Sequence, residues 1–232
     1  MKPIFLVILL FTINNVFGQF AVIQDKDSHV YVHKTATNGN IIDTLHNNQI
    51  IYCLWPKEDW YEVDYDKNLK SHFGFIHRSS VKFLTEFDSI YREKLTDALV
   101  VFKKDSFKII VTKVPFVIKN NRLQYRKANE KDHVANYLEK INGKEIWGED
   151  GGIPESQYGN IIIEINGKNI DLPKKEIENL FSPSLDNTSV NFDKTTGRLF
   201  ISAGNSDAAG AYAVLWIFEK GKYKKRLILL PF

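Results

Sequence analysis

Short runs in which apolar and polar residues alternate recur over residues 19–84. His29 to His33 alternates strictly, and Trp60 to Tyr65 follows the same period of two. Such alternation is typical of β-strands that bury one face. Turn-forming residues separate the runs, most clearly at Thr37-Asn38-Gly39-Asn40. We therefore expect a small barrel of short strands over this segment.

Strand signals continue over residues 98–232, where longer apolar runs predict a larger antiparallel β domain. The predicted hairpins join Leu99–Lys103 to Phe107–Val114 and turn at Asn142-Gly143 and Asn166-Gly167. Asn-Gly is a pair that two-residue hairpin turns prefer, because both turn residues need a positive φ. Residues 211–218 are apolar on both faces, which predicts a central strand buried on both sides.

Two segments have patterns that favour short helices. In residues 85–97, the expected linker between the domains, Phe87, Ile90 and Leu95 recur near one helical face. A second helix is expected from Pro173 to Phe181, with proline at its start. The predicted fold class is therefore mainly β, with a small barrel followed by a larger antiparallel β domain with one or two short helices.

Residues 1–18 have the features of a secretory signal peptide. Lys2 precedes an apolar run from Ile4 to Ile13, and Val16-Phe17-Gly18 places small residues where a signal peptidase cuts. The run is shorter than the roughly 20 residues of a membrane-spanning helix. We expect cleavage before Gln19, a periplasmic or secreted protein, and no membrane span after cleavage.

Composition narrows the classes of partner. The formal net charge is +3, and lysines and acidic residues are interspersed, so nucleic-acid binding is not expected. Cys53 is the only cysteine, which leaves an exported chain without an internal disulfide. The fold must then be stabilised by its apolar core, and 44% of the residues are hydrophobic.

Motifs in residues 19–84 occur in the order and spacing of a known family. They are Val30-Tyr31-Val32-His33-Lys34, Ile42-Asp43-Thr44-Leu45, Asp59-Trp60-Tyr61-Glu62-Val63 and the closing Phe73-Gly74-Phe75-Ile76-His77. The segment resembles a bacterial SH3 (SH3b) domain, and the resemblance implies that the small barrel is SH3-like. Its early motif differs, because the usual Asn-Val-Arg is Tyr31-Val32-His33 and the Gly-Pro expected after it is absent. The resemblance implies a binding module, often attached to cell-wall enzymes, that contacts peptidoglycan or a protein partner.

Three aromatic residues of the barrel are candidate ligand-binding residues: Tyr31, Trp60 and Phe75. Because strand side chains alternate between faces, Trp60 shares a face with Glu62 and Asp64, which we expect to be the solvent face. An exposed tryptophan and tyrosine on one small barrel would form a stacking platform for a sugar or a peptide. The alternative is that a loop or the second domain covers each ring, since single surface aromatics are common.

The second domain offers Trp147, Glu149 and Asp150, which lie in a glycine-rich loop. Glycines let a backbone approach a ligand closely. The alternative is a tight connection in which Trp147 fills the core. No Asp-x-Asp-x-Asp spacing is present, so calcium is not expected. We expect neither a metal nor a cofactor.

The sequence has few of the residue patterns that form the active sites of common hydrolases. Cys53 lies on a predicted strand, which favours a buried thiol over a nucleophile. The only histidine after residue 85 is His133, which excludes a histidine-rich zinc site there, and no Gly-x-Ser-x-Gly elbow is present. A carboxylate pair such as Glu149 and Asp150 stays open, provided that both lie on a loop.

Together these features predict an exported, non-catalytic binding protein that recognises cell-wall glycan, cell-wall peptide or a protein partner. Two alternatives stay open. One is an immunity or inhibitor protein that caps a toxin or a hydrolase. The other is a carboxylate-based cell-wall hydrolase.

Overall fold

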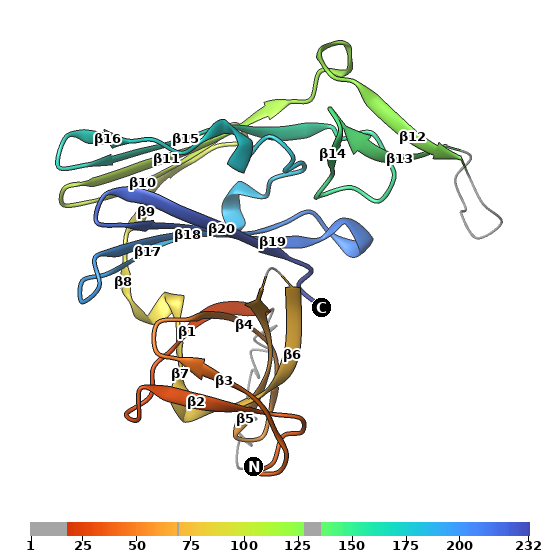
Figure 1. Ribbon diagram of the computed structural model, residues 1–232. Helices are drawn as coiled ribbons and strands as arrows, with labels where there is room; N and C mark the ends of the chain where they lie inside the picture. The colour runs from red at the N-terminus through yellow and green to blue at the C-terminus, as the bar shows by residue number, and fades with distance from the viewer. Residues whose placement is uncertain (1–17, 69, 128–135) are drawn as a thin grey trace, which may run out of the picture.

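The computed structural model describes residues 18–68, 70–127 and 136–232. The expected signal peptide lies outside these residues except for Gly18, and so does His133. Within the described ranges, no helix is long and apolar enough to cross a membrane. The chain is mainly β, as the sequence predicts, and its strands form three stacked layers (Figure 1).

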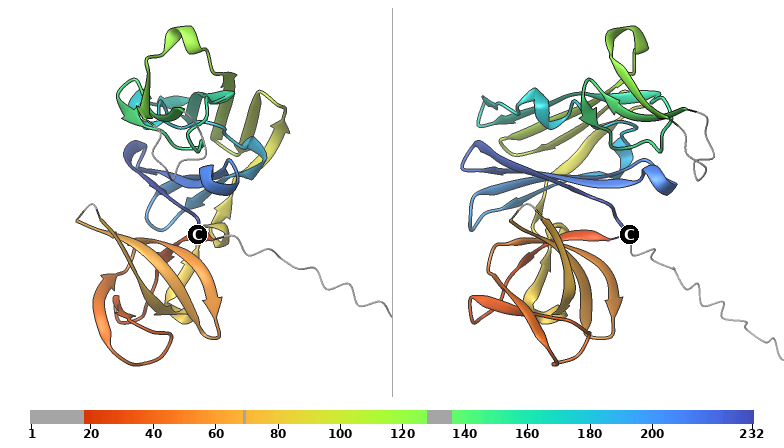
Figure 2. Two further views of the ribbon diagram at one scale, coloured as in Figure 1. Left: turned by 90° about the vertical axis from the view of Figure 1, so that its right-hand side faces the viewer. Right: turned by 45° about the vertical axis from the view of Figure 1, so that its right-hand side comes forward.

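Residues 19–83 form a seven-stranded antiparallel sheet that curls into a half-barrel (Figures 1 and 2). Its strands, in sheet order, are β3 (Ile41–His46), β2 (His29–His33), β6 (Lys70–His77), β5 (Trp60–Lys67), β4 (Ile50–Lys57), β1 (Gln19–Ile23) and β7 (Val81–Phe83). Alternate side chains point inward and form its core, with Val32, Val63 and Ile76 fully buried.

Two five-stranded antiparallel sheets follow. The outer sheet contains β16 (Lys168–Ile170), β15 (Ser156–Ile165), β11 (Phe107–Pro115), β10 (Leu99–Lys104) and β9 (Tyr91–Leu95). The middle sheet contains β20 (Lys222–Leu229), β19 (Tyr212–Glu219), β18 (Arg198–Asn205), β17 (Thr188–Asp193) and β8 (Asp88–Ser89). The two sheets pack face to face as a sandwich around the largest apolar core.

Smaller elements extend the sandwich. A three-stranded sheet contains β12 (Leu123–Lys127), β13 (Asn136–Ile141) and β14 (Lys144–Glu145). The helices among the described residues are single 3₁₀ turns: η1 (Arg78–Ser80), η2 (Leu84–Glu86), η3 (Ile118–Asn120), η4 (Lys174–Glu176), η5 (Leu185–Asn187) and η6 (Ala208–Gly210).

Strand β19 is buried on both faces, which confirms the prediction for this segment. Its even-numbered residues, such as Val214 and Trp216, face the outer sheet. Its odd-numbered residues, such as Leu215 and Ile217, belong to a second core shared with the half-barrel. The middle sheet is therefore the central layer of the molecule (Figure 1).

The half-barrel and the middle sheet share a continuous apolar core. Phe20, Val22, Tyr52 and Leu54 come from β1 and β4, and they pack with Phe200, Ala213, Leu215 and Ile217 from the middle sheet. Burial of such surface stabilises the contact by roughly 25 cal/mol per Å². The outward faces of β1 and β4 are consequently covered, and the half-barrel is fixed on the sandwich.

The prediction of a helix between Thr85 and Leu95 is wrong. Only η2 is helical there, and β8 and β9 pair with β17 and β10. The apolar residues fit this arrangement, because Ile90 enters the sandwich core while Phe87 packs beside the core shared with the half-barrel. Backbone pairing to two sheet edges therefore overrides a weak helical pattern.

The expected helix from Pro173 to Phe181 is also wrong, since only the three residues of η4 are helical. Leu180 and Phe181 make isolated bridges to Trp147 and Gln157. The three predicted hairpins are confirmed. Both Asn-Gly turns have positive φ at both residues, as the turn requires.

Candidate functional site

The structure brings the three predicted barrel residues to one outer face. Tyr31 lies on β2, Trp60 on β5 and Phe75 on β6, and these strands are neighbours in the sheet. The register places His33 opposite Phe75, and Trp60 opposite His77. Gly74 and Ile76 point inward, so their neighbours Phe75 and His77 point outward. Residues paired across a sheet share a face, so Tyr31, His33 and Trp60 also point away from the half-barrel core.

Trp60 itself is covered, contrary to the expected solvent exposure. Only 9% of its surface is exposed. The imidazole rings of His33 and His77 contact the indole edge to face, with ring centroids 5.0 and 5.4 Å away. The indole of Trp60 therefore packs beneath His33 and His77. These two histidines, and not the indole, contribute to the surface of this face.

Tyr31 and Phe73 are the most exposed aromatic residues of this face, at 46% and 55%. Phe75 is half-buried, and the Lys57 ammonium lies 5.7 Å from its ring centroid. We call the set Tyr31, His33, Phe73, Phe75 and His77 the aromatic face. Sequence reasoning missed Phe73, although it has the same strand parity as Phe75 in the motif Phe73-Gly74-Phe75.

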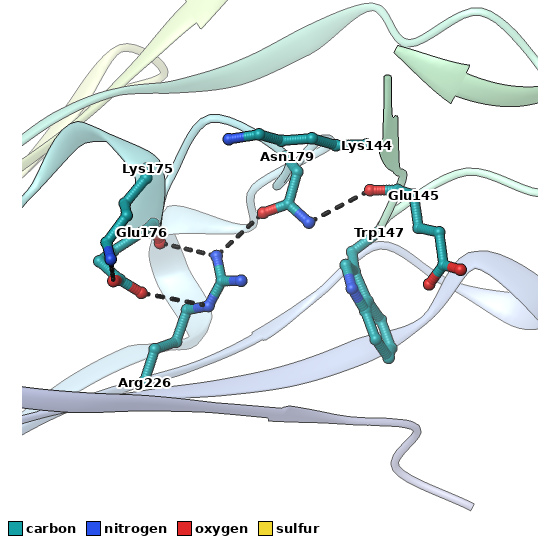
Figure 3. Close-up of a pocket in the computed structure, with 7 residues that line it drawn as sticks. All are labelled: Lys144, Glu145, Trp147, Lys175, Glu176, Asn179 and Arg226. Carbon is teal, nitrogen blue, oxygen red and sulfur yellow. Dashed lines mark hydrogen bonds and ion pairs between the residues drawn. The ribbon is translucent and has the colours of Figure 1, made fainter. Parts of the chain in front are cut away.

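A separate polar pocket of about 440 Å³ lies in the sandwich part (Figure 3). Its lining residues are Lys144, Glu145, Trp147, Lys175, Glu176, Asn179 and Arg226. We call it the Trp147 pocket. Of these residues only Trp147 was predicted. Lys144 and Glu145 lie just before it in the chain, whereas Lys175, Glu176, Asn179 and Arg226 come from two distant segments.

Arg226 of β20 is held in place on one side of the Trp147 pocket. Its Nη1 donates to the Glu176 carbonyl oxygen at 3.0 Å and to Asn179 Oδ1 at 2.9 Å, and its Nε lies 3.7 Å from Glu176 Oε2. Among the described residues Nη2 has no acceptor, and Figure 3 shows this nitrogen on the side of the guanidinium that faces the indole.

Trp147 forms the other side of the pocket. Its indole is half-buried against the sandwich core, with its ring centroid 6.2 Å from that of Tyr212. An aromatic surface opposite an available guanidinium N–H suits a ring-shaped ligand that carries a hydrogen-bond acceptor. The Trp147 ring thus packs on the core and also lines a pocket, and its role in ligand binding stays a prediction.

Glu149 and Asp150 are adjacent in sequence but bind different neighbours. Glu149 accepts a hydrogen bond from the Ser182 hydroxyl. Asp150 accepts one from the Tyr137 hydroxyl at 2.9 Å. Neither carboxylate lines the Trp147 pocket. The structure therefore does not bring the three predicted residues of this loop together in one site.

The glycine-rich loop that follows Trp147 packs against a second loop of small residues, at positions 205–210. Ser206 Oγ donates to the Gly148 carbonyl oxygen at 2.8 Å, and a Cβ on Gly210 would lie 3.1 Å from that oxygen. Gly148 has a φ of 107° and lies directly against the Phe181 carbonyl. Close backbone packing within the protein accounts for these glycines.

Reactive groups are few in the described part of the chain. Cys53 is buried in the half-barrel core, and burial raises the pKa of its thiol, so the thiol stays protonated. Within the described ranges, no three or more His, Cys, Asp and Glu side chains are grouped in a way that would hold a metal ion.

Comparison with family models, with curated proteins and with solved structures gave no match to the chain.

Proposed function

We propose that the protein is an exported, non-catalytic binding protein that recognises a cell-wall fragment through the aromatic face of its half-barrel. The observation that carries this proposal is the grouping of Tyr31, Phe73 and Phe75 on one face. This face lies on β2 and β6, whereas the core shared with the middle sheet covers β1 and β4. Export is inferred from the signal features of residues 1–18.

The chemistry of the aromatic face suits a glycan with attached peptide. Aromatic rings offer apolar area for the flat faces of sugar rings, and the Tyr31 hydroxyl and two imidazoles add hydrogen-bonding groups at its edges. The two imidazole rings are also held in place before binding, because His33 and His77 pack on buried Trp60. Fixed side chains lose less conformational entropy when a ligand binds.

The Trp147 pocket is a second candidate contact for a cell-wall fragment. Its indole and the available Nη2 of Arg226 provide stacking and a charged donor. This pocket belongs to the sandwich part, so a variant there tests it independently of the aromatic face.

The proposal is tested by cosedimentation of residues 19–232 with purified peptidoglycan sacculi. Tyr31→Ala should weaken binding about tenfold, which is typical of an aromatic interface anchor. Tyr125→Ala is the matched control, because Tyr125 on β12 is 48% exposed and lies outside both candidate contacts. Trp147→Ala reports on the pocket.

Absence of binding by the unaltered protein would overturn the proposal. A nanomolar complex with one protein, sensitive to Tyr31→Ala, would then favour the immunity or inhibitor function. Equal binding by Tyr31→Ala and Tyr125→Ala would remove the aromatic face from the site.

A further inference from the structure

A cleft of about 660 Å³ opens at one end of the sandwich, and its lining residues include none of the aromatic face or of the Trp147 pocket. It lies where the turns of four hairpins converge, on the left of the view in Figure 1. The lining residues are Ser106, Phe107, Ile165, Asn166, Lys168, Asn169, Ile170, Phe192, Gly197, Leu199, Phe218, Lys220 and Gly221. The volume falls within the roughly 300–1,000 Å³ of ligand pockets.

The interior of this cleft, which we call the hairpin cleft, is apolar. Phe107 of the outer sheet and Phe192 of the middle sheet form one wall, with ring centroids 4.8 Å apart. Leu199 and Phe218 belong to the core beneath it and are each 1% exposed. The cleft is thus an opening into the sandwich core between the two sheets.

Four apolar side chains of the hairpin cleft remain only half-buried: Phe107, Ile165, Ile170 and Phe192. Closer approach of the sheets would bury them, since covering apolar surface is favourable. The turns at Asn166-Gly167 and Lys220-Gly221 instead end the hairpins around an open mouth. An apolar ligand chain in the cleft would cover the exposed surface of these four side chains.

The charges at the mouth have one sign. Lys168 and Lys220 line the cleft, no acidic side chain is among its described lining residues, and neither lysine has an ion pair in the described ranges. The Trp147 pocket differs, because there Arg226 and Lys175 face Glu176. The hairpin cleft therefore has an apolar interior and a positive entrance.

We propose that the hairpin cleft binds a single-chain amphiphile with an anionic headgroup, such as a fatty acid. The chain lies between the sheets against Phe107, Phe192 and Phe218, and the headgroup is held by Lys168 and Lys220. A polar ligand is disfavoured because the hydrogen-bonding side chains Ser106, Asn166 and Asn169 are exposed, whereas the floor of the cleft is formed by apolar Leu199 and Phe218. This inference does not rest on the proposed function.

Two series of monomeric ligands test the proposal by titration calorimetry on residues 19–232. Octanoate, decanoate and dodecanoate should bind with a Kd that falls about fourfold per methylene, the effect of burying each group. Dodecyltrimethylammonium has the same chain and a cationic head, and it should bind at least about tenfold more weakly than dodecanoate. Equal affinity for the two heads, or a flat chain-length series, would overturn the proposal.

Variants locate the site. Lys168→Glu with Lys220→Glu should weaken dodecanoate at least about tenfold, whereas Lys119→Glu with Lys127→Glu makes the same change in net charge at exposed positions elsewhere and should leave affinity unaltered. Ile170→Trp should fill the cleft and abolish dodecanoate binding. Its thermal midpoint is measured first, to show that the variant is folded. If Ile170→Trp fails to fold, the comparison of the Lys168 and Lys220 variant with the Lys119 and Lys127 variant tests the assigned site. Equal loss in both lysine pairs would contradict the assigned site.

Discussion

Arg198 of the middle sheet reaches across to Asn48 in the half-barrel. Its Nη1 donates to the Asn48 carbonyl oxygen and its Nη2 to Asn48 Oδ1, each at 2.9 Å. On its own sheet the guanidinium contacts Asp193, at 3.6 Å, and Thr196, at 2.9 Å. One almost buried cation thus joins the two parts of the molecule beside their shared apolar core.

We expect Arg198→Ala to lower the free energy of unfolding by roughly 2–3 kcal/mol, because it removes charged hydrogen bonds and leaves Asp193 without its cation. Urea denaturation followed by tryptophan fluorescence measures this. Arg78→Ala is the control, because Arg78 and its partner Asp59 are both exposed, and it should change stability by less than about 1 kcal/mol. Similar losses in the two variants would show that Arg198 adds nothing beyond a surface ion pair.

Trp60→Ala should behave as a core variant. Deleting a buried indole costs roughly 3–5 kcal/mol, so the half-barrel should lose stability whether or not a ligand is present. Tyr31→Ala should alter stability by less than about 0.5 kcal/mol, because Tyr31 is a surface residue. Equilibrium unfolding in urea separates the two. A stable Trp60→Ala variant would mean that His33 and His77 do not depend on the indole.

The sequence predicts the strands well where a local rule decides them. The Asn142-Gly143 and Asn166-Gly167 hairpins follow from turn chemistry, and the double burial of β19 follows from its unbroken apolar run. The segment Tyr91–Leu95 is different, because its side chains are exposed and its strand state comes from backbone bonds to β10. No pattern within those five residues indicates a partner strand.

The candidate sites, too, could be predicted only where a local sequence pattern determines them. Strand parity places Tyr31 and Trp60 on the outer face, but it cannot show that His33 and His77 cover the indole. The Trp147 pocket depends on Arg226, which is 79 positions away in the chain and reaches the site only through sheet pairing. Contacts between such distant residues are set by tertiary packing.

Gly148→Ala should destabilise the fold strongly, by about 3 kcal/mol or more. The added Cβ would overlap the Phe181 carbonyl oxygen, and the φ of 107° disfavours any side chain. Gly204→Ala is the matched control, because its Cβ would meet nothing within 4 Å. Thermal unfolding compares them. A Gly148→Ala variant as stable as Gly204→Ala would refute the close packing of Gly148 against the Phe181 backbone.

Asp64 provides a prediction of pH dependence. It lies at the cleft between the half-barrel and β20, and burial raises the pKa of its carboxyl despite a hydrogen bond from Ser71. A raised folded-state pKa means that the ionised form opposes folding. The penalty is present above the folded-state pKa and disappears as the pH falls below the unfolded value of about 3.9.

Asp64→Asn should therefore raise the thermal midpoint by a few degrees at pH 7, and its advantage over the unaltered protein should vanish near pH 3. Asp25→Asn should do the opposite, because the hydrogen bond from Ser80 lowers the pKa of Asp25 and makes its ionised form favour folding. The cost of Asp25→Asn should persist from pH 7 down to the unfolded value of about 3.9 and fade only below it. Thermal midpoints measured from pH 3 to 7 give both differences, and a shared sign at pH 7 would show that burial does not control Asp64.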